Sequence, residues 1–300
     1  MELLRTPDSR FAALPDFPWA PHYLEPPFGD ARVRTAVVEA GPKDGGVVLM
    51  LHGEPSWSFL YRKVMAVVSA AGLRCVVPDL VGFGRTDKPS HIADYSYQRH
   101  MDWLHGLVDE LALRDVTLLC QDWGGLLGLR LVGERPDLFR GVVAANTFLP
   151  TGDIRPSDAF FRWREFATTT PSFDIGKVVE KGCARPMSAE VRAAYEAPFP
   201  DETFKAGARA FPALVPATSD DPASETNRWA WASLQQFERP FVTAFGDSDP
   251  ITRGADMLLQ AMIPGAKGQP HRTLERAGHF LQEDAGAELG DVVVEIAARD

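Results

Sequence analysis

An aspartate occupies the position in this chain where a nucleophile would be expected. Asp122 follows the short apolar run 116–120 and precedes residues 126–132, whose apolar side chains recur at helical spacing. A short apolar run is typical of a buried strand, so Asp122 is predicted to lie at a sharp strand-to-helix turn. With Gly124 after it, Asp122 takes the place of serine in the nucleophile elbow G-x-S-x-G, although Cys120 replaces the first glycine.

A carboxylate nucleophile suits an sp3 carbon that bears a leaving group. A serine at position 122 would form an ether, which water does not readily cleave, whereas Asp122 would form an ester whose carbonyl carbon water can attack. Aspartate is ordinarily ionised at neutral pH, so the first attack needs no base. A histidine is then free to deprotonate water in the second step.

Candidates for that histidine and its acid also follow predicted strands. Catalytic groups in open parallel sheets gather at the carboxyl ends of the strands. Asp247 and Asp249 share one turn after the apolar run 241–245, and His279 follows a weaker strand pattern at 271–274. The order nucleophile, acid, histidine is the order of hydrolase triads. In such a triad the acid fixes the imidazole tautomer and stabilises the imidazolium.

Strand-like and helix-like runs alternate around these residues. Strands are predicted at 33–38, 47–51, 73–77, 116–121, 142–145, 241–245 and 271–274. Helices are predicted at 59–71, 96–113, 123–134 and 284–298. Continuous apolar strands that alternate with helices predict an α/β fold, with a mostly parallel central sheet and helices on both faces.

The alternation stops between residues 151 and 236. This stretch shows no convincing strand pattern and is rich in phenylalanine and proline. It is predicted to be a helical cap domain inserted after one strand. Residues 1–150 and 237–300 would then form the core domain.

The composition excludes several classes of function. A net charge of −10 argues against nucleic acid or an anionic membrane as the main partner. No segment reaches the ~18 apolar residues of a membrane span, and the N-terminus lacks the apolar core of a signal peptide. Cys75, Cys120 and Cys183 form no C-x-x-C pair and no Cys/His cluster at metal spacing. They are predicted to be reduced thiols in a cytoplasmic protein.

Four motifs give the chain a resemblance to the α/β-hydrolase superfamily and, within it, to the haloalkane dehalogenases. They are His52-Gly53-Glu54-Pro55-Ser56-Trp57, Gln121-Asp122-Trp123-Gly124, Ala197-Pro198-Phe199-Pro200-Asp201 and Gly278-His279-Phe280. The elbow and the histidine are common to the superfamily, whereas Asp122-Trp123 together with Glu54 is more specific. The group resembled has two halide-binding tryptophans and its acid after the strand that follows the cap.

The resemblance implies hydrolytic dehalogenation through a covalent alkyl ester on Asp122. A haloalkane would give an alcohol, a halide ion and a proton, with His279 as the base. The resemblance favours Asp249 over Asp247 as the acid. Asn146 occupies the position where a related group keeps its acid, and an amide cannot serve as that anion. No metal or organic cofactor is implied.

A departing halide needs donors in a dry pocket, because an unpaired buried charge is costly. The resemblance implies that the indole N–H groups of Trp123 and Trp163 bind it, with Trp229 and Trp231 as the alternatives to Trp163. It also implies that the backbone N–H groups of Glu54 and Trp123 stabilise the oxyanion. His52 is predicted to be structural.

An apolar pocket is expected around these groups, since ligand sites are mostly apolar with few polar groups. The pocket residues we predict are Leu126, Phe148, Phe160, Ile251 and Phe280. Some of these side chains could instead pack between core and cap. The resemblance further implies a cis Glu54–Pro55 bond.

Other functions are compatible with parts of this pattern. An epoxide hydrolase shares the Asp-His-Asp chemistry but needs two acidic donors, usually cap tyrosines, and the predicted cap contains only Tyr195. A fluoroacetate-type dehalogenase needs an arginine where Trp123 stands, and a serine esterase needs serine at position 122. A catalytically inactive small-molecule-binding homologue would keep the pocket without the reaction. We expect a monomer that acts on small apolar halogenated substrates in detoxification.

Overall fold

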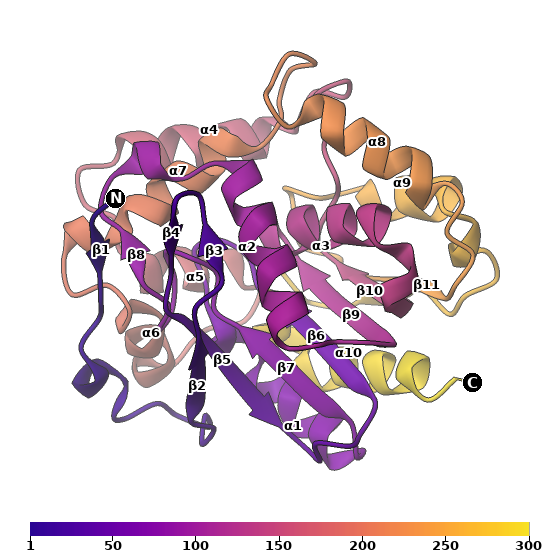
Figure 1. The fold of residues 1–300 in the computed structure, drawn as a ribbon, viewed down its shortest axis with the longest axis horizontal. Helices are drawn as coiled ribbons and strands as arrows, with labels where there is room; N and C mark the ends of the chain where they lie inside the picture. The colour runs from indigo at the N-terminus through magenta and orange to yellow at the C-terminus, as the bar shows by residue number, and fades with distance from the viewer. Residues whose placement is uncertain (300) are drawn as a thin grey trace.

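The computed structural model describes residues 1–299 and contains one eight-stranded sheet flanked by helices (Figure 1). In sheet order the strands are β12 (Arg272–Leu274), β11 (Phe241–Gly246), β10 (Phe139–Ala145), β9 (Val116–Gln121), β6 (Val47–Leu51), β7 (Arg74–Pro78), β5 (Thr35–Ala40) and β2 (Pro21–Leu24). The pairs from β12 to β7 are parallel, whereas β5 runs antiparallel to β7 and β2 runs antiparallel to β5. The predicted fold class is confirmed.

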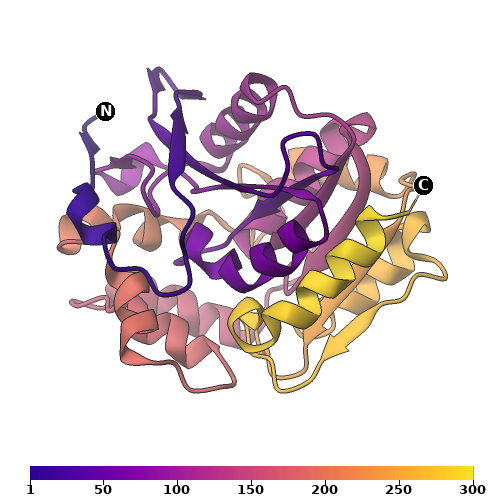
Figure 2. The ribbon, with the colours of Figure 1, turned by 90° about the horizontal axis from the view of Figure 1, so that it is seen from below.

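Helices cover both faces of this sheet, which explains why its central strands are apolar throughout. On one face α1 (Arg62–Ala70) and α10 (Leu281–Ala297) lie side by side (Figure 2). The other face carries α2 (Tyr97–Glu110) and α3 (Trp123–Glu134), while α9 (Ala255–Met262) packs near β11. Every residue of β9 is buried. Cys75 and Cys120 lie buried in strands, and all three cysteines are free thiols.

Five helices lie between β10 and β11, where the sequence predicts a helical insertion. They are α4 (Asp158–Thr169), α5 (Ile175–Gly182), α6 (Ala189–Glu196), α7 (Ala206–Leu214) and α8 (Ser224–Leu234). Within the described chain no strand interrupts them. The last of them, α8, packs along α3 of the core. Within residues 1–299 no helix is long and apolar enough to cross a membrane.

The strands near the N-terminus were not predicted from the sequence. The edge strand β2 begins with a proline and is only partly buried, so it lacks a strong apolar pattern. Two short pairs were also not predicted, namely β3 (Pro27–Phe28) with β4 (Ala31–Arg32) and β1 (Leu3–Leu4) with β8 (Lys88–Pro89). The strand predicted at 33–38 lies at 35–40, because its bounds follow its pairing with β7 and β2. The last helix begins at Leu281, not at residue 284.

Candidate active site

Asp122 lies between β9 and α3 in a backbone conformation that side chains seldom adopt, with φ 50° and ψ −125°. The two following glycines allow the close approach of α3 to neighbouring strands. A Cβ on Gly124 would lie 1.9 Å from the carbonyl oxygen of Leu51, and one on Gly125 would lie 1.9 Å from Oγ1 of Thr147. Strain of this kind is characteristic of functional positions and of the nucleophile elbow.

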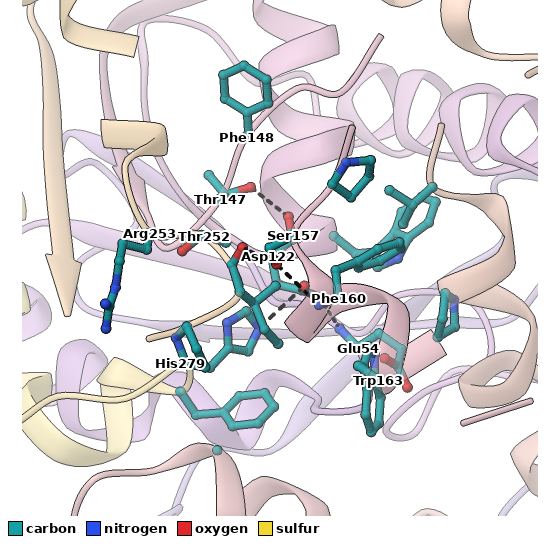
Figure 3. A pocket seen from close by; sticks show the side chains of 18 of the residues that line it. Glu54, Asp122, Thr147, Phe148, Ser157, Phe160, Trp163, Thr252, Arg253 and His279 are labelled. Carbon is teal, nitrogen blue, oxygen red and sulfur yellow. Dashed lines mark hydrogen bonds and ion pairs between the residues drawn. The ribbon is translucent and has the colours of Figure 1, made fainter. Parts of the chain in front are cut away.

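Three side chains from different strand ends meet at this turn. The imidazole Nε2 of His279 lies 3.4 Å from Oδ2 of Asp122 (Figure 3). The Nδ1 of His279 lies 3.0 Å from Oδ2 of Asp249. The backbone N–H of Glu54 donates to Oδ1 of Asp122 at 2.8 Å. Asp249 is buried whereas Asp247 is exposed, so the geometry favours Asp249 as the partner of His279.

The pKa values of His279 and Asp249 depend on the charges next to them. Burial alone would lower the pKa of His279, but the carboxylates of Asp249 and Asp122 outweigh it and raise the pKa to about 10. Burial alone would raise the pKa of Asp249, yet His279 and the Thr252 hydroxyl hold it below its usual value. At neutral pH the site therefore holds an imidazolium between two carboxylates.

Three side chains to which the sequence assigned no such role contact the His279 segment and its neighbours. The side-chain amide of Gln121 donates to the carbonyl oxygen of His279 at 3.1 Å, and its Nε2 lies 3.3 Å from the imidazole Nε2. The Asn146 amide donates to the carbonyl oxygens of Gly278 and His279 at 2.8 and 3.2 Å. The Asp284 carboxylate accepts from the backbone N–H of Gly278 at 2.9 Å. The sequence marks Gln121 only by its place before the nucleophile, and it marks Asn146 only by its place directly after β10.

A cavity of about 1210 Å³ opens onto Asp122 and His279. All five predicted pocket residues line it, namely Leu126, Phe148, Phe160, Ile251 and Phe280. Glu54, Trp123 and Trp163 also line it. Within the described chain the indole N–H of Trp123 has no protein acceptor, whereas the buried indoles of Trp57 and Trp103 both donate to protein oxygens.

Trp163 reaches this cavity from helix α4. The helix begins after Ser157, whose hydroxyl accepts from the backbone N–H of Phe160 and donates to the carbonyl oxygen of Ile251, both at 3.2 Å. Phe160 and Trp163 are three residues apart and so lie on the same side of the helix. The Glu54–Pro55 peptide bond is cis, as the resemblance implied.

The alternative tryptophans and His52 have other surroundings. Trp231 is buried and donates its indole N–H to the carbonyl oxygen of Leu149 at 2.8 Å, and Trp229 is 71% exposed. Neither is among the residues that line the cavity. His52 is buried and accepts the backbone N–H of Leu80 at 2.9 Å, which supports the structural role predicted for it.

Tyr195, the donor that an epoxide hydrolase would need, does not line the cavity. It is buried, and its hydroxyl hydrogen-bonds to Glu283. The carboxylate of Glu283 also binds the guanidinium of Arg62, so the tyrosine belongs to a polar cluster between α6, α1 and α10. This placement removes the one candidate for epoxide activation in the predicted cap.

Known proteins resemble this chain over nearly its whole length. A family model described as alpha/beta hydrolase fold matches residues 46–285. Haloalkane dehalogenases from Psychrobacter cryohalolentis and Mycolicibacterium paratuberculosis are 52% and 50% identical to it, each match covering 98% of both chains. The structure of a tetrameric haloalkane dehalogenase from Paraglaciecola agarilytica superimposes with a TM-score of 0.90 at 35% identity, with 97% of each chain covered.

Proposed function

The chain belongs to the haloalkane dehalogenases, hydrolases of the α/β-hydrolase fold that act on carbon–halogen bonds, and from this premise we propose that Asp122, His279 and Asp249 are its catalytic triad. The observation that carries the proposal is a continuous series of contacts: the Glu54 N–H donates to Asp122, Asp122 lies 3.4 Å from His279, and His279 hydrogen-bonds to Asp249. It lies at the wall of a largely apolar cavity.

In the first step one oxygen of Asp122 attacks the carbon that bears the halogen. The C–O bond forms as the carbon–halogen bond breaks, and the halide leaves with the bonding electron pair. Oδ1 already accepts the Glu54 N–H at 2.8 Å, so we assign Oδ2 as the nucleophilic oxygen. Oδ1 then becomes the ester carbonyl oxygen, placed to receive negative charge in the second step.

In the second step His279 removes a proton from water, which attacks the ester carbonyl carbon. The oxyanion on Oδ1 is stabilised by the backbone N–H groups of Glu54 and of Trp123, which opens helix α3. Collapse of the intermediate releases the alcohol and restores the carboxylate. Ester formation removes the charge of Asp122, one of the two carboxylates that raise the pKa of His279. Alkylation thereby lets the imidazolium release its proton to solvent, which is the proton product of the reaction, and His279 becomes a competent base.

An Asp122→Asn variant tests this coupling because it mimics the uncharged ester. We expect the pKa of His279, raised to about 10 by both carboxylates, to fall in the variant since only Asp249 remains charged. NMR titration of the His279 ring measures it. The exposed Asp102→Asn substitution serves as the control. An unchanged titration would show that Asp122 does not set the basicity of His279.

The halide site that we propose consists of the indole N–H groups of Trp123 and Trp163, both at the cavity wall. We expect Trp163→Phe to weaken bromide binding about tenfold or more, the effect of losing one hydrogen bond to an anion. Quenching of tryptophan fluorescence by bromide measures the affinity. Trp229→Phe removes an exposed indole outside the cavity and is the matched control. Equal affinities in the two variants would remove Trp163 from the site.

Further features of the proposed enzyme go beyond the family assignment. We propose that residues 151–236 form the cap domain, since Phe160 and Trp163 reach the cavity from α4. We also propose that the five apolar pocket side chains contact a small alkyl halide. The protein is proposed to work as a cytoplasmic monomer in detoxification, although the relative from Paraglaciecola agarilytica is a tetramer.

A further inference from the structure

The side chain of Glu54 has no role in the mechanism above, which uses only its backbone N–H. The residue is 3% exposed and lines the cavity together with Asp122. Its Oε1 is buried without a hydrogen-bond partner within the described chain. A buried carboxyl oxygen without a hydrogen bond costs free energy, so its presence at the cavity wall requires a physical explanation.

The surroundings of this carboxyl group favour its neutral acid form. Burial raises the pKa of Glu54 well above its usual value, and the negative charge of Asp122 raises it further. The charge of His279 and the neighbouring Trp163 indole act in the opposite direction without cancelling the rise. Glu54 and Trp163 lie next to each other at the cavity wall (Figure 3).

We propose that the Glu54 side chain is a positioning residue of the halide site, which as a neutral acid orients the Trp163 indole and keeps negative charge away from the bound halide. The inference rests on the halide site proposed above. The Trp163 indole lies beside the Glu54 carboxyl group, and an arriving halide takes over the indole N–H. A carboxylate would bind the indole more tightly and repel the halide, so a neutral partner is required.

Two neutral substitutions test, in turn, the neutral form of Glu54 and the acceptor that it offers to the Trp163 indole. Glu54→Gln keeps the shape, the neutrality and an acceptor for the Trp163 N–H, so we expect bromide affinity within about threefold of the wild type. Glu54→Leu removes the acceptor and should weaken bromide binding about tenfold, because the indole loses its orientation. Fluorescence quenching measures both. Wild-type affinity in Glu54→Leu, or a tenfold loss in Glu54→Gln, would overturn the proposal.

Infrared difference spectroscopy of the wild-type protein tests the neutral acid directly and does not depend on how the variants fold. Bromide addition should shift a protonated-carboxyl C=O band that is absent from Glu54→Gln. A spectrum with only carboxylate bands would overturn the inference. If Trp163→Phe weakens bromide binding while the Glu54 experiments fail, only this inference falls. If Trp163→Phe leaves binding unchanged, the halide site itself is wrong.

Discussion

A His279→Phe variant incubated with 1-bromobutane is expected to accumulate one butyl group per chain, bound to Asp122, and then to stop. The first step needs only the carboxylate, whereas the second step needs a base 3.4 Å from it, which phenylalanine cannot supply. Mass spectrometry of the intact protein and of the peptide containing Asp122 measures the adduct. Steady turnover should fall by at least ~10³-fold, as expected for the loss of a general base.

The controls show whether any change in His279→Phe comes from the loss of the base or from a general disturbance of the fold. His105→Phe replaces a histidine that pairs with Glu134 at the surface, and it should release bromide at the wild-type rate without retaining an adduct. The wild type should likewise show no lasting adduct if hydrolysis keeps pace with alkylation. An unmodified His279→Phe protein that still releases bromide would disprove the two-step mechanism.

The trapped ester also shows what happens to the protonation of His279 once Asp122 is no longer charged. Before the reaction His279 lies between two carboxylates, which raise its pKa to about 10, so it is a cation at neutral pH. A cation in the cavity wall favours the departure of a halide, but it cannot accept a proton from water. In the proposed mechanism, esterification of Asp122 removes one of the two anions. In that mechanism the same covalent step therefore releases the halide and lowers the pKa of His279, so that it can act as the base.

The parts of the site that could be predicted from the sequence are those encoded by consecutive residues. The strand before Asp122, the glycines after it and the helix behind them form one local pattern, and the structure has the same turn. The apolar strands of the sheet were found for the same reason. The edge strand β2 was not, because it is short, partly exposed and defined by its pairing with β5.

The contacts that were missed join residues far apart in the chain. Gln121 and Asn146 contact the His279 segment 158 and 132 residues away, and no local pattern encodes such a pairing. The family resemblance could supply the backbone role of Glu54, but not the surroundings of its side chain. Those surroundings depend on where α4 places Trp163, which is determined by packing of the inserted helices against the core.

The expected result for Asp122→Ser is at most one equivalent of bromide per chain, with turnover reduced by at least ~10⁴-fold. The substitution keeps a nucleophilic atom at the elbow and leaves His279 and Asp249 in place to activate it. Attack on an alkyl halide would nevertheless give an ether, which has no carbonyl carbon for water to attack. Bromide release during long incubation, together with the mass of the protein, measures the outcome. Asp102→Ser, an exposed position on α2, is the matched control.

This variant changes the nucleophile and leaves the binding pocket intact, so its effects on catalysis and on binding can be measured apart. The cavity, both indoles and the Glu54 N–H remain, so binding of substrate and halide should persist while catalysis is lost. Release of several equivalents of bromide would mean that the carbon–halogen bond breaks without an ester at position 122. Water activated by His279 would then be the attacking group, and Asp122 would act only through its charge on the imidazole.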